Sequence, residues 1–299
     1  MKVLVVGLVK NNQLKRLQKE GKKRGHVVDG CYASDLIIYS DNHEFSPILK
    51  GKDLKSYDLI YFWAVGKRRW EWYVAALYLS KNSKKVIVNK KVVDSDYKMY
   101  LTSAIDYLRQ YENNLPFPKS AIIFSKNSIE EVIERFNFPL IVKPSEGRQG
   151  KDVNLVNSRK ELIQIVDNLL KDVPSVVIRE FIPNDGDIRI FTIGYKAIAA
   201  MKRIPKKGDF RSNISQGGKG EIYEIYKYPD IKYMSEYLSE LTRTEIAGVD
   251  IIINKETGKP YILEINPGPQ FTGMEYYTKK NIALEIIKYF EKLTKKTKI

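Results

Sequence analysis

The chain has 299 residues, of which 43% are hydrophobic, with one cysteine, two histidines and a formal net charge of +15 at pH 7. This composition predicts a packed core and a chain long enough for two or three units of ordinary domain size. A single cysteine excludes a disulfide within the chain and a thiolate metal site, and two histidines argue against a histidine site. Any bound metal ion must therefore be held mainly by oxygen atoms.

The apolar stretches of the chain are too short for a membrane segment. Residues 1–12 do not form a signal peptide or a spanning helix, and no later stretch reaches about 18 apolar residues. We therefore expect a soluble, cytoplasmic protein. The positive charge is compatible with nucleic acid, an acidic protein surface or anionic small molecules. Much of it lies in lysine clusters typical of a solvated face, so specific nucleic-acid binding is not expected.

Residues 1–95 are predicted to form a small α/β unit. Its expected elements are strands in 1–7, 56–65 and 84–89 and helices in 11–25 and 70–80. The alternation of strands and helices indicates a parallel sheet. No G-x-G-x-x-G follows the first strand, so the dinucleotide-binding fingerprint is absent. We expect this unit to supply one wall of a substrate pocket.

Two further units are expected, in residues 96–175 and 176–299. The first should contain helices in 97–112, 128–136 and 158–170 and strands in 138–145 and 151–156, with Ser158 as a helix N-cap. The second reads mostly as strands, in 175–182, 187–194 and 196–204, followed by a hairpin in 248–269 and a final helix in 282–293.

The hairpin in 248–269 is the most informative segment. Two β-branched apolar runs flank the turn 254–259, which has Gly258 at its bend. Centring the turn on Thr257 places Asp250 opposite Glu264. The same register predicts that Val249, Ile251 and Ile253 lie opposite Ile265, Leu263 and Tyr261.

Directly opposed like charges repel each other on a sheet, unless a cation lies between them. Asn266 follows Glu264 by two residues and therefore shares its face. Two carboxylates and an amide oxygen suit Mg²⁺ or Mn²⁺. The alternative is a solvent-facing hairpin edge whose two acids are hydrated, and the register alone does not decide between these interpretations.

Three upstream segments carry groups suited to a nucleotide. Lys143 ends a strand ahead of a glycine-containing loop in 145–151, which can close over a polyphosphate, although no Walker motif is present. Residues 180–182 can offer backbone groups to an adenine edge, and Asp187 can bond a ribose hydroxyl. The alternative for Lys143 and its loop is a surface turn. The alternative for residues 180–182 and Asp187 is an ordinary hairpin with an Asp187–Arg189 pair.

A basic segment in 201–218 provides guanidinium groups, which suit carboxylate or phosphate. The segment contains four basic residues, Arg203, Lys206, Lys207 and Arg211. They are followed by Ser212, Asn213 and a Gly-Gly pair. Such a loop can stabilise charge that develops on a transferred phosphoryl group. The alternative is a basic loop that binds nothing.

Each of these elements is weak alone, but their order along the chain resembles the ATP-grasp ligases of the RimK type over roughly residues 94–290. The sequence of motifs is a lysine and glycine loop, E-F-I, D-x-R, A-A-M-K-R, F-R-S-N, G-V-D and E-I-N-P. The resemblance implies a mixed α/β and α+β architecture, with an ATP-grasp fold that follows an N-terminal Rossmann-like (preATP-grasp) domain. It assigns nucleotide binding to Lys98, Lys143, Gln149, Glu180, Phe181, Ile182, Asp187, Arg211, Ser212 and Asn213. It assigns catalysis to Arg189, Arg203, Arg211 and Asn213, and metal binding to Asp250, Glu264 and Asn266.

Two positions depart from the family pattern. The loop reads EGRQGKDV where relatives often have G-S-x-G-x-G-V, and Gln270 replaces a glycine near the amine acceptor. The identity of the acceptor is therefore the point that the resemblance supports least.

The resemblance implies an ATP-dependent carboxylate–amine ligase that works through an acyl phosphate. It would add an amino acid such as glutamate to an acidic acceptor, which is a protein tail or a small molecule. The implied cofactors are ATP and two Mg²⁺ or Mn²⁺ ions. Relatives commonly associate, so a homo-oligomer is possible, but the sequence does not fix the oligomeric state. Two alternatives are a phosphotransferase on the same scaffold and a non-catalytic basic module that binds nucleic acid or an acidic protein.

Overall fold

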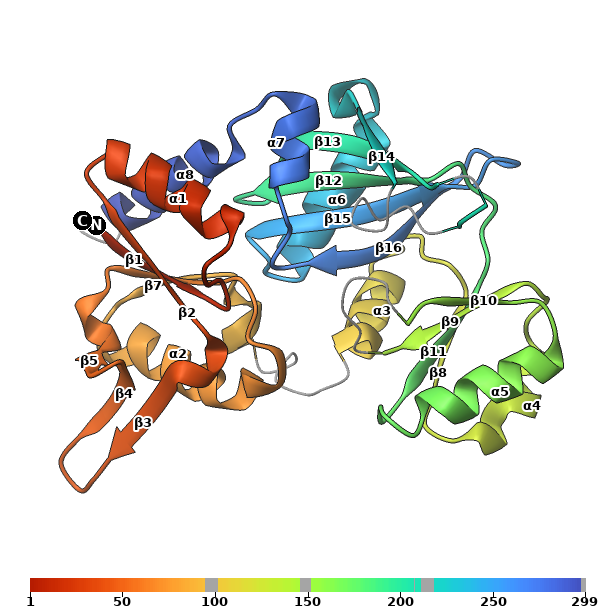
Figure 1. Ribbon diagram of the computed structural model, residues 1–299, viewed down its shortest axis with the longest axis horizontal. Helices are drawn as coiled ribbons and strands as arrows, with labels where there is room; N and C mark the ends of the chain where they lie inside the picture. The colour runs from red at the N-terminus through yellow and green to blue at the C-terminus, as the bar shows by residue number, and fades with distance from the viewer. Residues whose placement is uncertain (95–101, 146–151, 207, 211–217, 297–299) are drawn as a thin grey trace.

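The computed structural model describes residues 1–94, 102–145, 152–206, 208–210 and 218–296 (Figure 1). Five residues that the resemblance assigns to nucleotide binding or catalysis lie outside these ranges: Lys98, Gln149, Arg211, Ser212 and Asn213. Among the described residues, no helix has the length and apolar character that crossing a bilayer requires.

The N-terminal unit is built on a parallel sheet with the strand order β2-β1-β6-β7. Its strands are β1 (Lys2–Val6), β2 (Val27–Cys31), β6 (Leu59–Phe62) and β7 (Val86–Val88). Alternate side chains of β1 enter different cores: Val3 and Val5 pack towards α1 (Asn12–Lys23), whereas Leu4 and Val6 pack towards α2 (Arg69–Asn82). The α/β architecture expected for this unit is confirmed.

Sequence patterns missed several strands in residues 27–53. β2 is short and contains Asp29 and Gly30, which weaken a strand signal. A small antiparallel sheet follows, formed by β3 (Leu36–Ser40), β4 (Phe45–Leu49) and β5 (Lys52–Asp53). The hairpin of β3 and β4 projects from the unit in Figure 1.

The central sheet is antiparallel and has the order β10-β9-β11-β8. It consists of β8 (Ser120–Ile123), β9 (Leu140–Pro144), β10 (Asn154–Val156) and β11 (Val176–Glu180), and α4 (Ile129–Ile133) and α5 (Arg159–Leu169) cover one face. The expected N-cap is confirmed, because the side chain of Ser158 accepts a hydrogen bond from the N–H of Glu161. α3 (Thr102–Glu112) precedes this sheet.

Strand β11 was grouped with the C-terminal segment by sequence, but it pairs with β8 and β9. The physical reason is that Val176 and Ile178 complete the apolar face under α4 and α5. Sheet membership thus follows burial and hydrogen bonding rather than chain order, and the expected division at residue 175 cuts just ahead of a strand of the central sheet.

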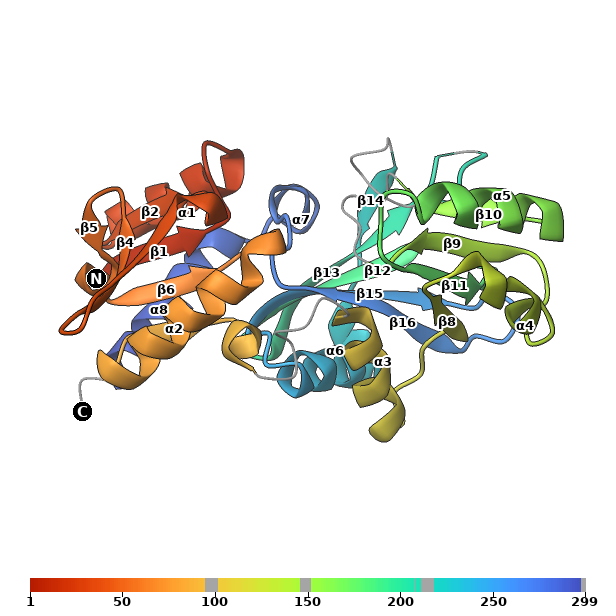
Figure 2. The same cartoon turned by 90° about the horizontal axis from the view of Figure 1, so that it is seen from below.

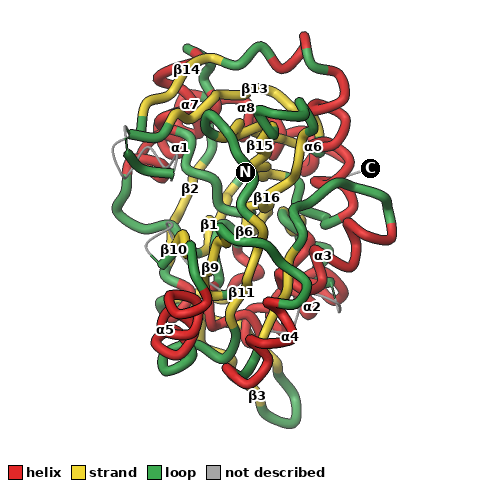
Figure 3. Tube along the Cα trace, turned by 90° about the vertical axis from the view of Figure 1, so that its right-hand side faces the viewer, coloured by secondary structure: helices red, strands yellow, loops and turns green. Residues whose placement is uncertain are grey.

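The C-terminal sheet is antiparallel and has the order β14-β13-β12-β15-β16. Its strands are β12 (Asp187–Ile193), β13 (Lys196–Ile204), β14 (Lys219–Ile222), β15 (Ile246–Ile253) and β16 (Pro260–Asn266). α6 (Pro229–Leu241) packs on one face, below the sheet in Figure 2. In Figure 3, α4 and α5 lie at the opposite end of the molecule from β13 and β14.

The end of the chain returns to the N-terminal unit. After α7 (Thr272–Thr278), helix α8 (Ile282–Lys296) lies beside α1, and its Phe290 and Ile286 share a core with Val3 and Val5. Beside this core, Arg24 and His26 of the N-terminal unit contact the carboxylate of Glu291 on α8 at 2.8 and 2.7 Å. The Arg24 hydrogen bond is the main cause that holds the pKa of Glu291 at about 2.

Replacing Phe290 with alanine tests this docking. Phe290 is fully buried with its ring 5.6 Å from that of Tyr61, so Phe290→Ala should lower the free energy of unfolding by about 3–5 kcal/mol. Urea denaturation followed by circular dichroism measures the change. Lys292→Ala, on the exposed side of the same helix, is the control. A loss for Phe290→Ala no larger than the control's would contradict this packing of α8.

Candidate active site

The register of the hairpin agrees with the sequence at the two acids. Asp250 on β15 lies opposite Glu264 on β16, and Val249 lies opposite Ile265, as expected. Beyond Asp250 the prediction was wrong, because Ile251 pairs with Ile262 and Ile253 pairs with Pro260. A β-bulge inserts one extra residue into β16 at this point, which a strict period of two cannot anticipate.

The two opposed acids have different environments. The side chain of Asp250 is 5% exposed, whereas that of Glu264 is 46% exposed. Arg189 donates from Nε to Asp250 Oδ1 at 2.7 Å and from Nη2 to Oδ2 at 2.5 Å, and Arg203 Nη2 donates to Oδ2 at 2.8 Å. Guanidinium groups therefore neutralise Asp250 in this structure, so its position opposite Glu264 does not by itself require a metal ion.

A fourth charge completes this buried cluster. Arg203 also donates from Nη2 to Asp187 Oδ2 at 2.7 Å. Asp187 and Arg189 share a face of β12, and each takes its hydrogen-bond partner from a neighbouring strand, β13 or β15. The expected local alternative, an Asp187–Arg189 pair, is therefore not the arrangement found. We call Asp187, Arg189, Arg203 and Asp250 the four-charge cluster.

The two aspartates of the cluster differ in pKa. Burial raises the pKa of Asp187 to about 6, against the opposing effect of Arg203. Burial also acts to raise the pKa of Asp250, but the charges of Arg189 and Arg203 outweigh it and hold the value at about 2. The pKa of Asp250 is therefore lower than that of Asp187, because two guanidinium groups hydrogen-bond to Asp250.

Lys143 on β9 faces this hairpin from the central sheet. Its Nζ lies 4.0 Å from Glu264 Oε2, and β16 is the edge strand of its sheet, nearest the central sheet in Figures 1 and 2. Burial and the charge of Arg179 lower the pKa of Lys143, while Glu264 acts in the opposite direction. The structure thus brings together Lys143 and Glu264, two predicted site residues that are far apart in sequence.

Arg179 and Tyr107 also belong to this region, and sequence reasoning missed them. Arg179 is 5% exposed, and its Nη2 donates to Tyr107 Oη at 2.6 Å and to the carbonyl of Leu263 at 3.2 Å. Arg179 therefore holds the backbone just before Glu264. One sequence feature could have indicated Arg179: it is a charged residue within an apolar strand, VVIREF, on the face opposite to that of Ile178.

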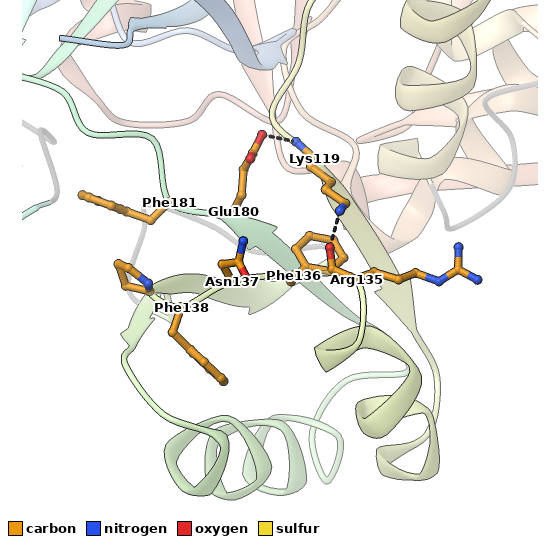
Figure 4. Close-up of a pocket in the computed structure, with 8 residues that line it drawn as sticks. Lys119, Arg135, Phe136, Asn137, Phe138, Glu180 and Phe181 are labelled. Atoms are coloured by element: carbon orange, nitrogen blue, oxygen red, sulfur yellow. Dashed lines mark hydrogen bonds between the residues drawn. The ribbon is translucent and has the colours of Figure 1, made fainter. Parts of the chain in front are cut away.

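Two residues of the predicted adenine hinge, Glu180 and Phe181, line a pocket of about 210 Å³ (Figure 4). The N–H of Glu180 donates to Lys119 O at 2.9 Å, that of Phe181 donates to Pro139 O at 3.3 Å, and the N–H of Lys119 donates to Glu180 Oε1 at 2.6 Å. Since Glu180 follows Arg179, its side chain lies on the other face of β11 from Arg179. This pocket is therefore not the space beside Lys143, and the adenine contact of Glu180, Phe181 and Ile182 stays a prediction.

The three predicted metal ligands are chemically suited to a hard divalent ion. Asn266 Nδ2 donates to Glu264 Oε1 at 2.7 Å, so the carboxylate and the amide are adjacent. A carboxylate offers about four acceptor positions, and Asp250 receives three N–H donors, which leaves one position available. Among the described residues, no group of three or more His, Cys, Asp or Glu side chains could hold a metal ion. The proposed ligand set, of two acids and one amide, stays a prediction.

Comparison with known proteins decides the family. The model of the RimK-like ATP-grasp domain matches residues 103–290. The chain belongs to the RimK-like ATP-grasp family. It is therefore an ATP-dependent ligase that forms C–N bonds, with the ATP-grasp fold, in a family that uses ATP and magnesium.

Relatives extend the similarity of this RimK-like chain beyond the matched domain. A protein of Vibrio vulnificus named "Probable alpha-L-glutamate ligase" is 29% identical over 285 residues, which cover 94% of this chain and 91% of the relative. A protein of the same name from Legionella pneumophila is 34% identical over 184 residues, 60% of each chain.

Solved structures share the fold at low sequence identity. A complex of the ATP-grasp ligase PsnB with a phosphomimetic variant of its minimal precursor, Mg and ADP has a TM-score of 0.73 at 16% identity, with 98% of each chain covered. D-cycloserine synthetase DcsG has a TM-score of 0.70 at 11% identity, covering 98% of this chain and 100% of its own.

Removing the carboxylate of Glu264 tests the proposed site. Glu264→Ala should abolish turnover with the fold intact by circular dichroism, because the exposed oxygen ligand beside Asn266 and Lys143 is lost. ADP release is the measurement. Glu256→Ala, in the exposed turn of the same hairpin, should keep wild-type turnover. Wild-type-like activity in both Glu264→Ala and Asp250→Asn would contradict the assignment of these two residues as metal ligands.

Removing one arginine from the four-charge cluster should have a pH-dependent cost. Arg203→Met leaves Asp187 and Asp250 with less positive charge and should lower the free energy of unfolding by about 3–5 kcal/mol at pH 7. Because Arg203 lowers the pKa of both acids, its loss raises their folded-state values. Groups with raised folded-state pKa take up protons on folding, so the deficit should shrink as the pH falls from 7 towards 5.

Urea denaturation at both pH values measures this effect. Lys202→Met, on the adjacent position of β13, should change stability by no more than about 0.5 kcal/mol at either pH. A deficit for Arg203→Met that stays constant or grows at pH 5 would contradict the charge assignment.

Proposed function

We propose that this RimK-like ligase joins the amino group of an amino acid such as glutamate to the carboxylate of an acidic acceptor. The observation that carries the proposal is the approach of Lys143 on β9 to Glu264 on β16, beside Asn266 and the four-charge cluster. A cation from one sheet and oxygen ligands from the other suit a polyphosphate held between them.

In the proposed reaction a carboxylate oxygen of the acceptor attacks the γ-phosphorus of ATP. The bond from that phosphorus to the β–γ bridging oxygen breaks, which yields an acyl phosphate and ADP. The amino group then attacks the acyl carbon, loses a proton and expels inorganic phosphate. The products are an amide, ADP and phosphate.

The residues act by binding and by charge. Lys143 would hold the phosphates, and Arg189, at the edge of the four-charge cluster, would offset charge near the transferred group. Asp250, Glu264 and Asn266 would hold magnesium, with two ions as the working expectation; bound magnesium supplies neutralisation of the phosphate oxygens. Arg203 is 4% exposed and hydrogen-bonded to both aspartates, so we assign it to the support of Asp250 rather than to direct contact.

The family pattern suggests nucleotide-binding and catalytic roles for five further residues, and we keep these assignments: Lys98, Gln149, Arg211, Ser212 and Asn213. Asp187 keeps its ribose-side assignment, although its carboxylate pairs with Arg203 in this structure. These roles are proposals for mutagenesis.

Two further facts support an acidic substrate. The net charge of +15 favours approach of anionic molecules. The relatives are named "Probable alpha-L-glutamate ligase", and the structural neighbour PsnB is described with a precursor peptide. The acceptor class, a protein tail or a small acid, is the part of the proposal that experiment must decide.

Mass spectrometry of reactions with ATP, magnesium, isotope-labelled glutamate and a panel of acidic peptides and metabolites tests the proposal. We expect an acceptor that gains the mass of a glutamyl residue, with one ADP released per addition, and no product with Glu264→Ala. A gain of phosphate mass instead would favour a phosphotransferase. Salt-sensitive RNA binding without ATP turnover would favour the binding module.

A further inference from the structure

Asn89 lies buried at the end of β7, where the N-terminal sheet meets the hairpin of β15 and β16. Its backbone is left-handed, with φ 64° and ψ 66°, and the residue is 1% exposed. Asparagine tolerates this conformation better than most residues. A buried polar side chain needs hydrogen-bond partners, and those of Asn89 come from three separate parts of the chain.

The amide of Asn89 uses both of its polar atoms. Nδ2 lies 3.1 Å from Phe62 O, 3.2 Å from Ile246 O and 2.8 Å from Pro267 O, and Oδ1 accepts a hydrogen bond from the N–H of Ile246 at 2.9 Å. One side chain therefore joins the end of β6, the start of β15 and the residue that follows Asn266.

The N-terminal unit also holds the chain beyond Pro267. Tyr61 Oη donates to Pro267 O at 3.4 Å, and Gln13 Oε1 accepts a hydrogen bond from the N–H of Phe271 at 3.1 Å. Gly268 lies so close to Trp63 that a Cβ atom there would come within 2.4 Å of the Trp63 carbonyl oxygen. The segment 267–271 is thus bound to the N-terminal unit at both of its ends.

Pro269 of this segment and Arg189 of the four-charge cluster both lie close to Gly248 on β15. A Cβ atom on Gly248 would lie 2.9 Å from the side chain of Pro269 and 3.6 Å from Arg189 Cδ. On the other side of the proposed ligands, Arg179 holds the carbonyl of Leu263. Glu264 and Asn266 therefore lie between two anchors, Arg179 from the central sheet and Asn89 from the N-terminal sheet.

We propose that Asn89 is a positioning residue of the ligase, whose amide sets where the end of β16, with Glu264 and Asn266, lies relative to Arg189. Displacement of reacting or ligating groups by about 1 Å can reduce a rate by about 100-fold, so an anchor one residue from Asn266 affects chemistry without touching substrate. The inference rests on the proposed function, because it takes Glu264 and Asn266 as the ligands at the reacting end of the nucleotide.

Substitution by glycine isolates the amide from the backbone. Asn89→Gly keeps a residue that adopts a left-handed φ without strain and removes the hydrogen bonds. Asn114→Gly is the matched control, since Asn114 is also left-handed, with φ 54°, but is exposed and outside the site.

The first measurement is calorimetric binding of ADP with and without Mg²⁺. The ratio of the two dissociation constants reports how much the metal contributes to nucleotide affinity. We expect this ratio to fall at least about fivefold in Asn89→Gly and to stay at the wild-type value in Asn114→Gly, with metal-free ADP affinity unchanged in both. An unchanged ratio in folded Asn89→Gly overturns the inference.

The second measurement is steady-state turnover with an acceptor that the wild type uses. We expect kcat to fall at least about tenfold, a larger change than the rise in KM for ATP that follows from the weaker Mg²⁺-dependent binding, because Lys143 and the hinge belong to the central sheet and still bind the nucleotide. A purely structural role would lower stability and leave kcat unchanged, and that result overturns the inference. If Asn89→Gly does not fold, Gln13→Ala serves at the other end of the segment, with the same expectation and the same contradicting result.

Glu264→Ala separates failure of the inference from failure of the proposed function. If Glu264→Ala lowers the Mg²⁺-dependent affinity ratio and Asn89→Gly does not, the ligand assignment stands and the inference is wrong. If neither variant changes the ratio, the ligand assignment is wrong and the inference falls with it.

Discussion

The structure depends on the pairing of two buried aspartates with two arginines in the sheet of β12, β13 and β15. Burying charges is unfavourable unless each has a partner in good geometry, and the four-charge cluster meets this condition with hydrogen bonds between neighbouring strands. The cluster fixes Asp250 firmly in place. Its strand partner Glu264 stays half exposed and accessible to a ligand. The two opposed acids of the hairpin thus differ, because Asp250 is buried and paired with arginines and Glu264 is partly exposed.

The proposed site draws on three of the four sheets in the described part of the chain rather than on one. The central sheet contributes Lys143 and Arg179, the hairpin contributes Glu264 and Asn266, and the N-terminal unit contributes the Asn89 contact to Pro267. α8 adds to this arrangement by returning to pack on α1. The N-terminal unit lacks a dinucleotide fingerprint, but it has a clear physical role, because it holds the backbone that leads from the proposed ligands to segment 267–271.

Much of the fold could be predicted from periodicity, and much of the site from motif order. Strands with long β-branched runs, the cap at Ser158 and the pairing of Asp250 with Glu264 all follow from local chemistry. The bulge beyond Asp250 could not be predicted, because one inserted residue changes the register without a distinct local signal. The short strands in residues 27–53 lacked the apolar alternation that identifies longer ones.

The sequence by itself determined the family, the two opposed acids and the residue types available for a phosphate and a hard metal ion, because these depend on local spacing and on side-chain chemistry. Only the tertiary structure decided which charges are paired. It placed Arg189 and Arg203 on Asp250, Arg179 beside Lys143, and Asn89 beside Pro267, although up to 178 residues separate such partners. Contacts of this kind arise from sheet order and from the packing of separate units, and neither is encoded in the spacing of residues along a single strand.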